Sequence, residues 1–550
     1  MTSQPFRRLA PVFVGLLSLA LPCLGAQEPP AAPPQPLAQR LQPILRARFP
    51  GSGRPPELPL AAGGSFRAAS SLPCFYDRRA YAPAWVGDQG SKPDADELIA
   101  ALADAPTDGL DAERYRLADL RQRLAAVRAR PTPGDLAEID LRLTDAFLSL
   151  AADLRNGAVN PELIYSDCEI DIPEVDLSAV LESALAAHRV RPALAELAPT
   201  HAGYRGLKAA LAQYRALAAH GGWPAVPDGP PLKAGDRNPR VAALRVRLEA
   251  SSDLPPAAPG AAAPTDRDLF DASLQEAVRR FQNRHGLDPD GAAGKGTLAA
   301  LAVPAERRVR QIEINLDRWR WLPRDLGERY IIVNIAGFEL NLMEGGAPAL
   351  SMRVVAGKPT NRTPMFTSTM TNIVLNPYWN PPPGIMKKEI LPHIARDPGY
   401  ADREGFEVVR SGSRVEVRQR PGPKNALGKV KFLFPNRFDV YLHDTPSRSL
   451  FSRTVRSFSH GCIRLEKPVE LAEYLLKDDP AWTPQRIAAA LARGREQWVT
   501  VPRPLPVHLV YWTAWVDDAG TAQFRDDLYG RDKPLLEILG KDEPQGVAAP

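Results

Sequence analysis

The chain has 550 residues, which at roughly 150 residues per domain predicts three or four domains. Hydrophobic residues make up 44% and charged residues 24%, values that exclude a chain disordered throughout. The net charge of +5 comes from 69 basic and 64 acidic residues. This even balance, without a basic block, excludes a typical nucleic-acid-binding protein. Four cysteines are too few for a disulfide scaffold.

The N-terminal residues 1–26 have the pattern of a secretory signal peptide. Arg7 and Arg8 supply the positive region, residues 9–24 form a charge-free apolar run, and Ala26 is a small residue suited to cleavage. We therefore expect an exported, periplasmic protein that has no integral membrane segment after cleavage and lies in an oxidising compartment.

Two alternatives for this segment stay open. A permanent anchor needs about 20 apolar residues, and the run is shorter and interrupted by proline. Lipidation at Cys23 is the other alternative, although Pro22 stands where the lipidation motif has a small residue.

The next two segments are predicted to be a Pro-rich linker, 27–37, and a helical scaffold domain, 38–225. Asp135 and Glu138 indicate a capping box at the start of one helix, and Gly157 indicates its end. The helix carries an apolar stripe, Leu136, Ile139, Leu143, Phe147 and Leu150. A second stripe precedes Gly221 and consists of Tyr204, Leu207, Leu211, Tyr214 and Leu217. Such stripes are typical of core packing, so this region shows no chemistry.

Residues 232–303 follow a Pro/Gly-rich boundary and carry a short helical pattern, an Ala/Pro-rich insert at 255–264 and regularly placed loop glycines. The apolar positions of this pattern are Val241, Leu244, Leu248, Phe270, Leu274, Val278, Phe281, Leu287, Leu298 and Leu301. The segment resembles the small three-helix peptidoglycan-binding module of cell-wall enzymes. A spacer without a ligand is the alternative.

From residue 305 the pattern becomes β-rich. Residues 330–335 and 338–342 predict a hairpin turning at Ala336-Gly337, and 354–357 and 373–375 predict further strands. Residues 438–443 alternate, which predicts a strand ending at His443. The C-terminal extension 506–550 predicts another hairpin, with strands at 507–516 and 523–524.

Residues 383–428 interrupt this pattern with proline, glycine and charge. They hold nine basic residues and six acidic ones. We interpret the segment as an insertion that acts as a mobile capping loop, or lid, over a site.

One cysteine lies in a chemically suggestive frame, Ser459-His460-Gly461-Cys462-Ile463-Arg464. An exported protein rarely keeps a free thiol unless the thiol is used or paired. Gly461 lets a substrate approach the backbone, and the amides of Gly461 and Cys462 are candidates for an oxyanion hole. His443 meets the requirement for a base beside a nucleophilic thiol. A structural cysteine with two incidental histidines is the alternative.

The spacing of His443 and Ser459-His-Gly-Cys-x-Arg464 resembles the signature of the L,D-transpeptidase catalytic domain. With the surrounding segments, the chain resembles the large periplasmic L,D-transpeptidases of Gram-negative bacteria. The resemblance implies a multidomain α+β protein. It has a helical N-terminal scaffold, a three-helix peptidoglycan-binding module and a β-sandwich-like catalytic domain at 305–505 with the inserted lid.

The resemblance also implies a reaction on peptidoglycan stem peptides without a cofactor or metal. Cys462 would attack the carbonyl before the terminal D-alanine, release that residue and form a thioester, and an amine of a second stem would then make a 3→3 cross-link. His443 would be the base, and Ser459, His460 and Gly461 would shape the turn. Arg464 would face a stem carboxylate or form a structural salt bridge. Tyr378 and Trp379 would line the cleft or pack in the core.

Four other functions are alternatives. An L,D-carboxypeptidase would use water as the acceptor, and a non-enzymatic wall-binding protein would bury or pair Cys462. A zinc peptidase or a penicillin-binding serine enzyme would need His-Glu-x-x-His or Ser-x-x-Lys with Lys-Thr-Gly, and neither set is evident.

Two further expectations concern the cysteines and the histidines. Because Cys23 leaves with the signal peptide and Cys462 must stay free to act, we expect a disulfide between Cys74 and Cys168. Of the two histidines near the thiol, we expect His443 to be the base. His460 lies in the same tight turn as the thiol, and neighbours that close often point apart.

Overall fold

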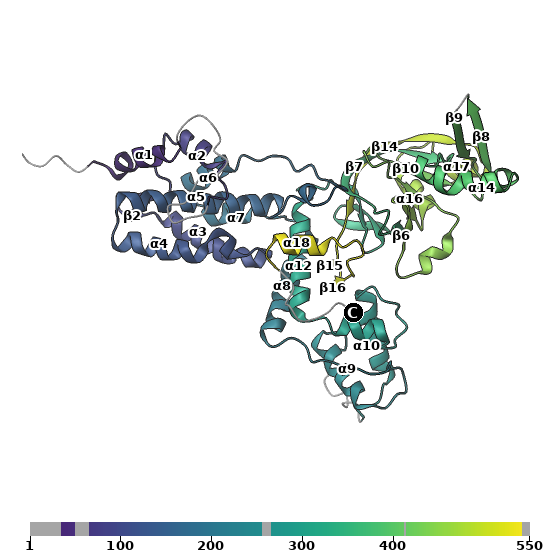
Figure 1. Cartoon of the computed structure of the whole chain (residues 1–550), viewed down its shortest axis with the longest axis horizontal. Coiled ribbons are helices and arrows are strands. Elements are labelled where there is room, and N and C mark those ends of the chain that lie inside the picture. The colour runs from purple at the N-terminus through teal and green to yellow at the C-terminus, as the bar shows by residue number, and fades with distance from the viewer. Residues whose placement is uncertain (1–34, 50–64, 256–265, 412–413, 542–550) are drawn as a thin grey trace, which may run out of the picture.

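A computed structural model describes residues 35–49, 65–255, 266–411 and 414–541. The predicted signal peptide 1–26 with Cys23, most of the linker 27–37 and nearly all of the insert 255–264 lie outside the described residues. The expected mixed α+β class is confirmed: helices build the N-terminal half, and a large sheet builds the rest. Figure 1 shows an elongated molecule with the helical unit at one end and the sheet at the other.

The N-terminal helical unit packs around one long helix, α5 (Pro133–Asn156). Thr132 is its N-cap and accepts a hydrogen bond from Asp135 N, so the predicted capping box at Asp135 is wrong. The helix begins earlier because Pro133 is preorganised for the first helical position. It ends at Gly157 as predicted. The other elements of the unit are α1 (Leu37–Ala47), α2 (Leu72–Arg78), β1 (Val86–Gly87), β2 (Gly90–Ser91), α3 (Pro93–Asp104), α4 (Leu117–Ala129), α6 (Leu177–Ala186) and α7 (Val190–Ala195).

Two helices, α8 (Ala202–Ala219) and α12 (Ala305–Arg320), pack side by side in the middle of the molecule. Between them in the chain lie the three helices predicted for 232–303, which are α9 (Pro239–Ala250), α10 (Ala272–Arg284) and α11 (Lys295–Leu301). They have their own apolar core, which includes Leu244 and Phe281. Within the described ranges, no helix has the length and apolar character needed to cross a membrane.

Ten strands form one large sheet within the described part of the chain. The predicted hairpin is present, with β4 (Arg329–Asn334) and β5 (Glu339–Glu344) antiparallel. Nine of them follow the order β10-β11-β13-β6-β5-β4-β14-β7-β3, where β3 is Cys168–Glu169, and the tenth, β12, pairs with β6. Because β10 also pairs with β7, the sheet closes on itself around an apolar core. The remaining strands are β6 (Ala347–Gly357), β7 (Met365–Leu375), β10 (Val430–Leu433), β11 (Leu442–His443), β12 (Ser457–Ser459), β13 (Ile463–Leu465) and β14 (Gln497–Val510), and the helices α16 (Pro468–Leu476) and α17 (Pro484–Ala492) follow β13.

The expected disulfide between Cys74 and Cys168 is wrong, because both cysteines are free thiols in the structure. Cys74 is exposed on α2. Cys168 is buried in β3 (Cys168–Glu169), which pairs with β7 of the large sheet. The two residues therefore belong to different packing units, although both lie in the N-terminal part of the chain.

Two β predictions near the C-terminal half need correction. Residues 438–441 do not form a strand: Asp439 has φ +55°, and only Leu442–His443 joins the sheet. In the tail, 507–510 belong to β14 of the large sheet rather than to a separate hairpin. The tail hairpin is the shorter pair β15 (Ala514–Val516) and β16 (Ala522–Phe524), followed by α18 (Asp532–Ile538).

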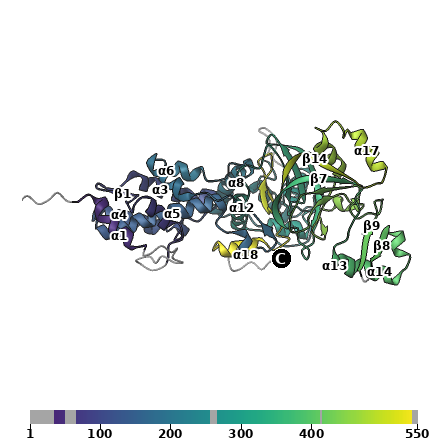
Figure 2. The same cartoon turned by 90° about the horizontal axis from the view of Figure 1, so that it is seen from above.

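The insertion predicted at 383–428 folds as a small lobe at the far tip of the sheet (Figure 2). Ile390, Phe406 and Val417 are buried in its own small apolar cluster. Its base closes where Trp379 and Gln419 exchange two backbone hydrogen bonds. Its elements are α13 (Pro383–Ile385), a π-helical turn (Met386–Ile390), α14 (Leu391–Arg396), α15 (Tyr400–Arg403), β8 (Phe406–Ser411) and β9 (Arg414–Gln419).

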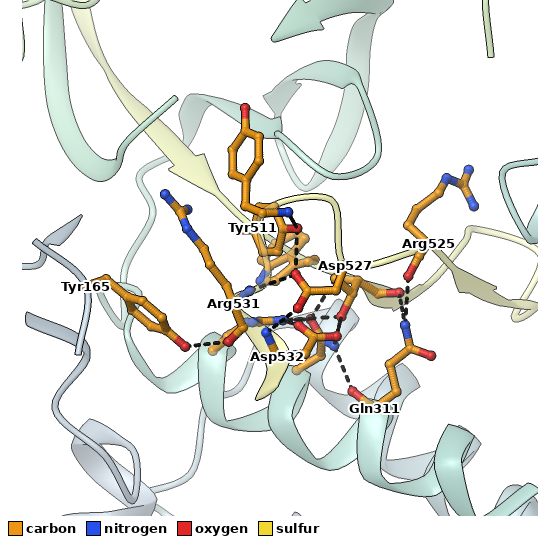
Figure 3. Close-up of polar contacts among 12 residues, drawn as sticks. Tyr165, Gln311, Tyr511, Arg525, Asp527, Arg531 and Asp532 are labelled. Atoms are coloured by element: carbon orange, nitrogen blue, oxygen red, sulfur yellow. Dashed lines mark hydrogen bonds and ion pairs between the residues drawn. The ribbon is translucent and has the colours of Figure 1, made fainter. Parts of the chain in front are cut away.

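The segment before α18 joins the sheet to α12 and to Tyr165 of the N-terminal half (Figure 3). Asp527 accepts hydrogen bonds from Tyr511 Oη and from the backbone nitrogens of Arg531 and Asp532, at 2.7 to 2.8 Å. Tyr165, from the N-terminal half, donates to Arg531 O at 2.6 Å. A buried ion pair of 2.7 Å joins Asp532 to Arg318 of α12.

Candidate functional site

The sheet places His443 at the end of β11 and Cys462 directly before the neighbouring strand β13. Strand β11, which ends at His443, runs parallel to β13, and His443 is paired with Arg464 in the register. Leu442 and Ile463 point into the apolar core. Because side chains alternate along a strand, His443 and Arg464 point to the opposite face, as does Cys462, which immediately precedes β13.

The imidazole of His443 is held in one orientation by the backbone. Its Nδ1 donates a hydrogen bond to the carbonyl oxygen of Asp444 at 2.5 Å. Nε2 is then the ring atom that can accept a proton. Burial, aided by the positive charge of Arg464, lowers the pKa of His443 to about 3. The ring is therefore neutral near neutral pH, with a lone pair on Nε2.

The thiol of Cys462 is half-buried and surrounded by polar groups from β10 and the segment before β11. Its Sγ lies 3.8 Å from the carbonyl oxygen of Asp439. Burial raises the pKa of the Cys462 thiol, whereas hydrogen bonds from the backbone and hydroxyl of Tyr441 and the charge of Lys431 lower it. Burial prevails, so the resting pair is a neutral thiol beside a neutral imidazole. A thiol in this state needs a nearby proton acceptor before it can react as a nucleophile.

The turn that carries the thiol is fixed by its own hydrogen bonds. Ser459 Oγ donates to Cys462 O, and Gly461 N donates to Ser459 Oγ at 3.1 Å. The Gly461 amide is therefore paired with Ser459 in this structure, and the oxyanion hole expected from the Gly461 and Cys462 amides stays a prediction. Gly461 has φ +116°, a conformation that favours glycine.

The other two predicted polar residues of the frame differ in environment. His460 is exposed, and its Nε2 lies 3.1 Å from Glu389 of the insertion. This nitrogen therefore faces the insertion. Arg464 is half-buried, burial lowers its pKa, and its buried Nε has no hydrogen-bond partner among the described residues. It also has no carboxylate partner within the described part of the chain, so the structural salt bridge is absent there.

Tyr378 and Trp379 lie between the site and the insertion. Trp379 packs on the insertion's apolar cluster and is near enough to Tyr441 to lower the pKa of its hydroxyl. The ring of Tyr378 lies under Arg418 of the insertion, 4.4 Å from the guanidinium carbon. Both residues are half-buried. Both residues therefore contact the insertion from the side of the site.

The sequence interpretation missed two groups at the site, Tyr441 and Lys431. The Lys431 ammonium lies 3.9 Å from the centre of the Tyr441 ring, and Lys431 is paired with His443 in the register. The only signal was the alternation of 438–443, which put Tyr441 and His443 on one face. Among the described residues, no group of three or more His, Cys, Asp and Glu side chains could hold a metal ion.

Comparisons with protein families give three matches along the chain. Residues 70–211 match a scaffold domain, 237–301 a putative peptidoglycan binding domain, and 328–483 an L,D-transpeptidase catalytic domain. A protein of Haemophilus influenzae, provisionally named an L,D-transpeptidase, is 33% identical over 244 residues, 41% of this chain. The chain spans about half of that relative, 49% of its length.

Solved L,D-transpeptidases are similar at lower identity. One from Mycobacterium smegmatis is 16% identical, with 33% of this chain and 58% of that chain covered and a TM-score of 0.18. One from Xylanimonas cellulosilytica is 17% identical, with 52% and 98% covered and a TM-score of 0.16.

Proposed function

We propose that this chain, which carries an L,D-transpeptidase catalytic domain and a peptidoglycan-binding domain, is an exported cysteine transpeptidase. In this proposal it cross-links peptidoglycan stem peptides in the periplasm by 3→3 bonds. The family matches support the enzyme class, and the N-terminal signal pattern supports export.

One observation carries the proposal. The imidazole of His443, on the strand next to the one that follows Cys462, is neutral and held in one tautomer. His443 Nδ1 is committed to the Asp444 carbonyl at 2.5 Å, and the pKa of His443 is lowered to about 3. The ring is therefore unprotonated near neutral pH, and Nε2 carries the lone pair that would take the thiol proton during attack. The half-buried thiol of Cys462 is open to a substrate, unlike the buried thiol of Cys168.

The reaction then has two halves. Cys462 Sγ attacks the carbonyl carbon of the third stem residue while His443 takes the thiol proton. The bond to the terminal D-alanine breaks, and its nitrogen leaves with that proton. In the second half an amine of another stem attacks the thioester, His443 takes the amine proton, and the sulfur leaves and regains a proton. Tyr441, whose backbone and hydroxyl lower the pKa of the thiol, stabilises the sulfur whenever it bears negative charge.

The proposed activity is tested with disaccharide-tetrapeptide and the purified chain, analysed by mass spectrometry. We expect release of D-alanine and a dimer joined through the third residues. Accumulation of tripeptide without dimer would identify an L,D-carboxypeptidase instead. The control is Cys462→Ala, which removes the sulfur and should give neither product. Unchanged substrate with the wild-type chain would contradict the enzyme proposal and favour a wall-binding protein.

A further inference from the structure

A buried threonine links the turn of the nucleophile to the end of strand β6. Thr363 is fully buried, and its hydroxyl donates to the carbonyl oxygen of Gly461 at 2.8 Å. The same hydroxyl accepts a hydrogen bond from Gly357 N at 2.9 Å. Gly461 is bonded directly to Cys462, so the position of its carbonyl restricts the backbone that presents the thiol.

The loop 358–362, between Gly357 and Thr363, leaves little freedom for this link. A side chain at Gly357 would place its Cβ 2.1 Å from the carbonyl oxygen of Asn361. Lys358 N donates to Ser459 O at 3.0 Å. The loop therefore contacts the turn at Ser459 through its first residue. Thr363, which follows the loop, contacts the turn at Gly461.

The C-terminal segment holds this loop in turn. Tyr529 Oη donates to Gly357 O at 2.7 Å and accepts from Thr363 N at 3.3 Å. Arg531 donates to Thr363 O at 3.3 Å and forms an ion pair with Asp167. Tyr529 is itself fixed by stacking on Tyr511, with ring centres 5.3 Å apart. Figure 3 shows Tyr511, Arg531 and Asp527 gathered in this cluster.

We propose that Tyr529 and Thr363 are positioning residues for the nucleophile, acting through the carbonyl of Gly461. The inference rests on the proposed function of Cys462. Tyr529 lies outside the region 328–483 that matches the catalytic-domain family. The C-terminal segment therefore completes the active site of this chain as well as joining its parts.

The test compares single-hydroxyl variants in the full-length chain. Tyr529→Phe and Thr363→Val each remove one hydroxyl, and Thr363→Ser keeps it. The readouts are the rate of Cys462 acylation by a carbapenem, followed by intact mass, kcat and KM for the tetrapeptide, and the urea midpoint. We expect Tyr529→Phe and Thr363→Val to slow acylation about tenfold to hundredfold, since small misplacements of reacting groups are costly. The loss should fall on kcat rather than KM, and Thr363→Ser should recover most of the rate.

Tyr165→Phe is the matched control, because it removes a buried hydroxyl of the same cluster that donates to Arg531 O and does not touch Gly357 or Thr363. We expect it to lower the urea midpoint while acylation stays near the wild-type rate. Equal acylation losses in Tyr165→Phe and Tyr529→Phe, or no loss in Thr363→Val, would overturn the inference. If Tyr529→Phe does not fold, the Thr363→Val and Thr363→Ser pair decides. A wild-type chain that carbapenem fails to acylate would instead contradict the proposed function.

Discussion

At the residue scale, the two histidines near the thiol have different partners and should have different roles. His443 is buried with its Nδ1 on a backbone carbonyl, whereas His460 is exposed and faces Glu389. We predict that His443→Ala slows carbapenem acylation of Cys462 by about 10²–10⁴-fold, the usual contribution of a general base. His460→Ala should have a much smaller effect. Stopped-flow acylation kinetics on both variants measure this, and the reverse order of effects would exchange the two roles.

Burial of His443 should also make stability depend on pH. Its pKa is about 3 in the folded chain, against about 6.5 when unfolded. Between these values the unfolded state binds the additional proton, so the folded state loses stability as pH falls below about 6.5. The loss approaches about 1.4 kcal/mol per pH unit. His443→Gln should remove this component.

The measurement is urea unfolding of both chains at pH 7 and pH 4.5. Relative to pH 7, the wild-type chain should lose about 2 to 3 kcal/mol more than His443→Gln at pH 4.5. His508, whose pKa burial lowers to about 4, contributes equally to both chains and cancels in the comparison. Parallel pH curves would show that His443 is not buried neutral.

At the scale of elements, the insertion has its own small core and a base where two segments meet. Trp379 N donates to Gln419 O at 3.0 Å, and Gln419 N donates to Trp379 O at 2.8 Å. Residues 383–418 can therefore be replaced by a short Gly-Ser linker without separating the ends. We predict that the shortened chain folds with nearly unchanged stability but turns over tetrapeptide at least tenfold more slowly, because its contacts above the site are lost.

Two assays separate folding from function in this variant. Thermal unfolding checks the fold, and alkylation by iodoacetamide reports access to Cys462. We expect alkylation as fast as in the wild-type chain or faster, since the contact between Glu389 and His460 is removed. Unchanged tetrapeptide turnover in a well-folded variant would show that the insertion is not a working lid.

The sequence was most informative where periodicity is local. The apolar stripes of α5 and α8 and the hairpin of β4 and β5 follow directly from spacing. The strand predicted at 438–443 failed because Asn436 satisfies the backbone instead of a neighbouring strand. Its Oδ1 accepts from Phe438 N and Val440 N at 3.0 and 3.1 Å, and its Nδ2 donates to Phe434 O and Val440 O at 2.8 Å. Asparagine in this role is a recognised turn signal.

Contacts between residues distant in sequence left no local pattern from which they could be predicted. Cys168 pairs with the large sheet about 200 positions later in the chain, which places it away from Cys74. The pairing of Tyr529 with Gly357 and Thr363 is equally distant in sequence. Cys462 and His443 were found because their spacing matches a family signature, but Thr363 and Tyr529 act through tertiary contacts that no spacing reveals.

At the scale of the whole molecule, the three-helix unit packs directly against the tail hairpin of β15 and β16, in addition to being joined to it through the chain. Phe524 of β16 is buried, with its ring centre 5.6 Å from that of His285 of the three-helix unit and 5.4 Å from that of Tyr214 of α8. Arg525 donates to Arg284 O at 3.1 Å. The proposed wall-binding unit should therefore hold a fixed orientation toward the thiol, so that a bound glycan strand presents its stems from one direction.

This arrangement gives a prediction for Phe524→Ala. The ring joins units that each have a separate core, so its loss should release the three-helix unit while each unit stays folded. Removing a buried phenylalanine costs about 3–5 kcal/mol, which weakens the docking even though the hydrogen bond from Arg525 to Arg284 O and the exposed contact between Thr454 and Asp288 remain. Small-angle X-ray scattering should show a larger radius of gyration. The control Thr454→Val removes only the exposed contact and should leave the scattering unchanged.

Turnover of soluble tetrapeptide should persist in Phe524→Ala, whereas cross-linking of intact wall fragments should fall, because the wall-binding unit no longer orients the strand. Equal losses on both substrates would mean that Phe524 supports the sheet rather than the docking of the three-helix unit.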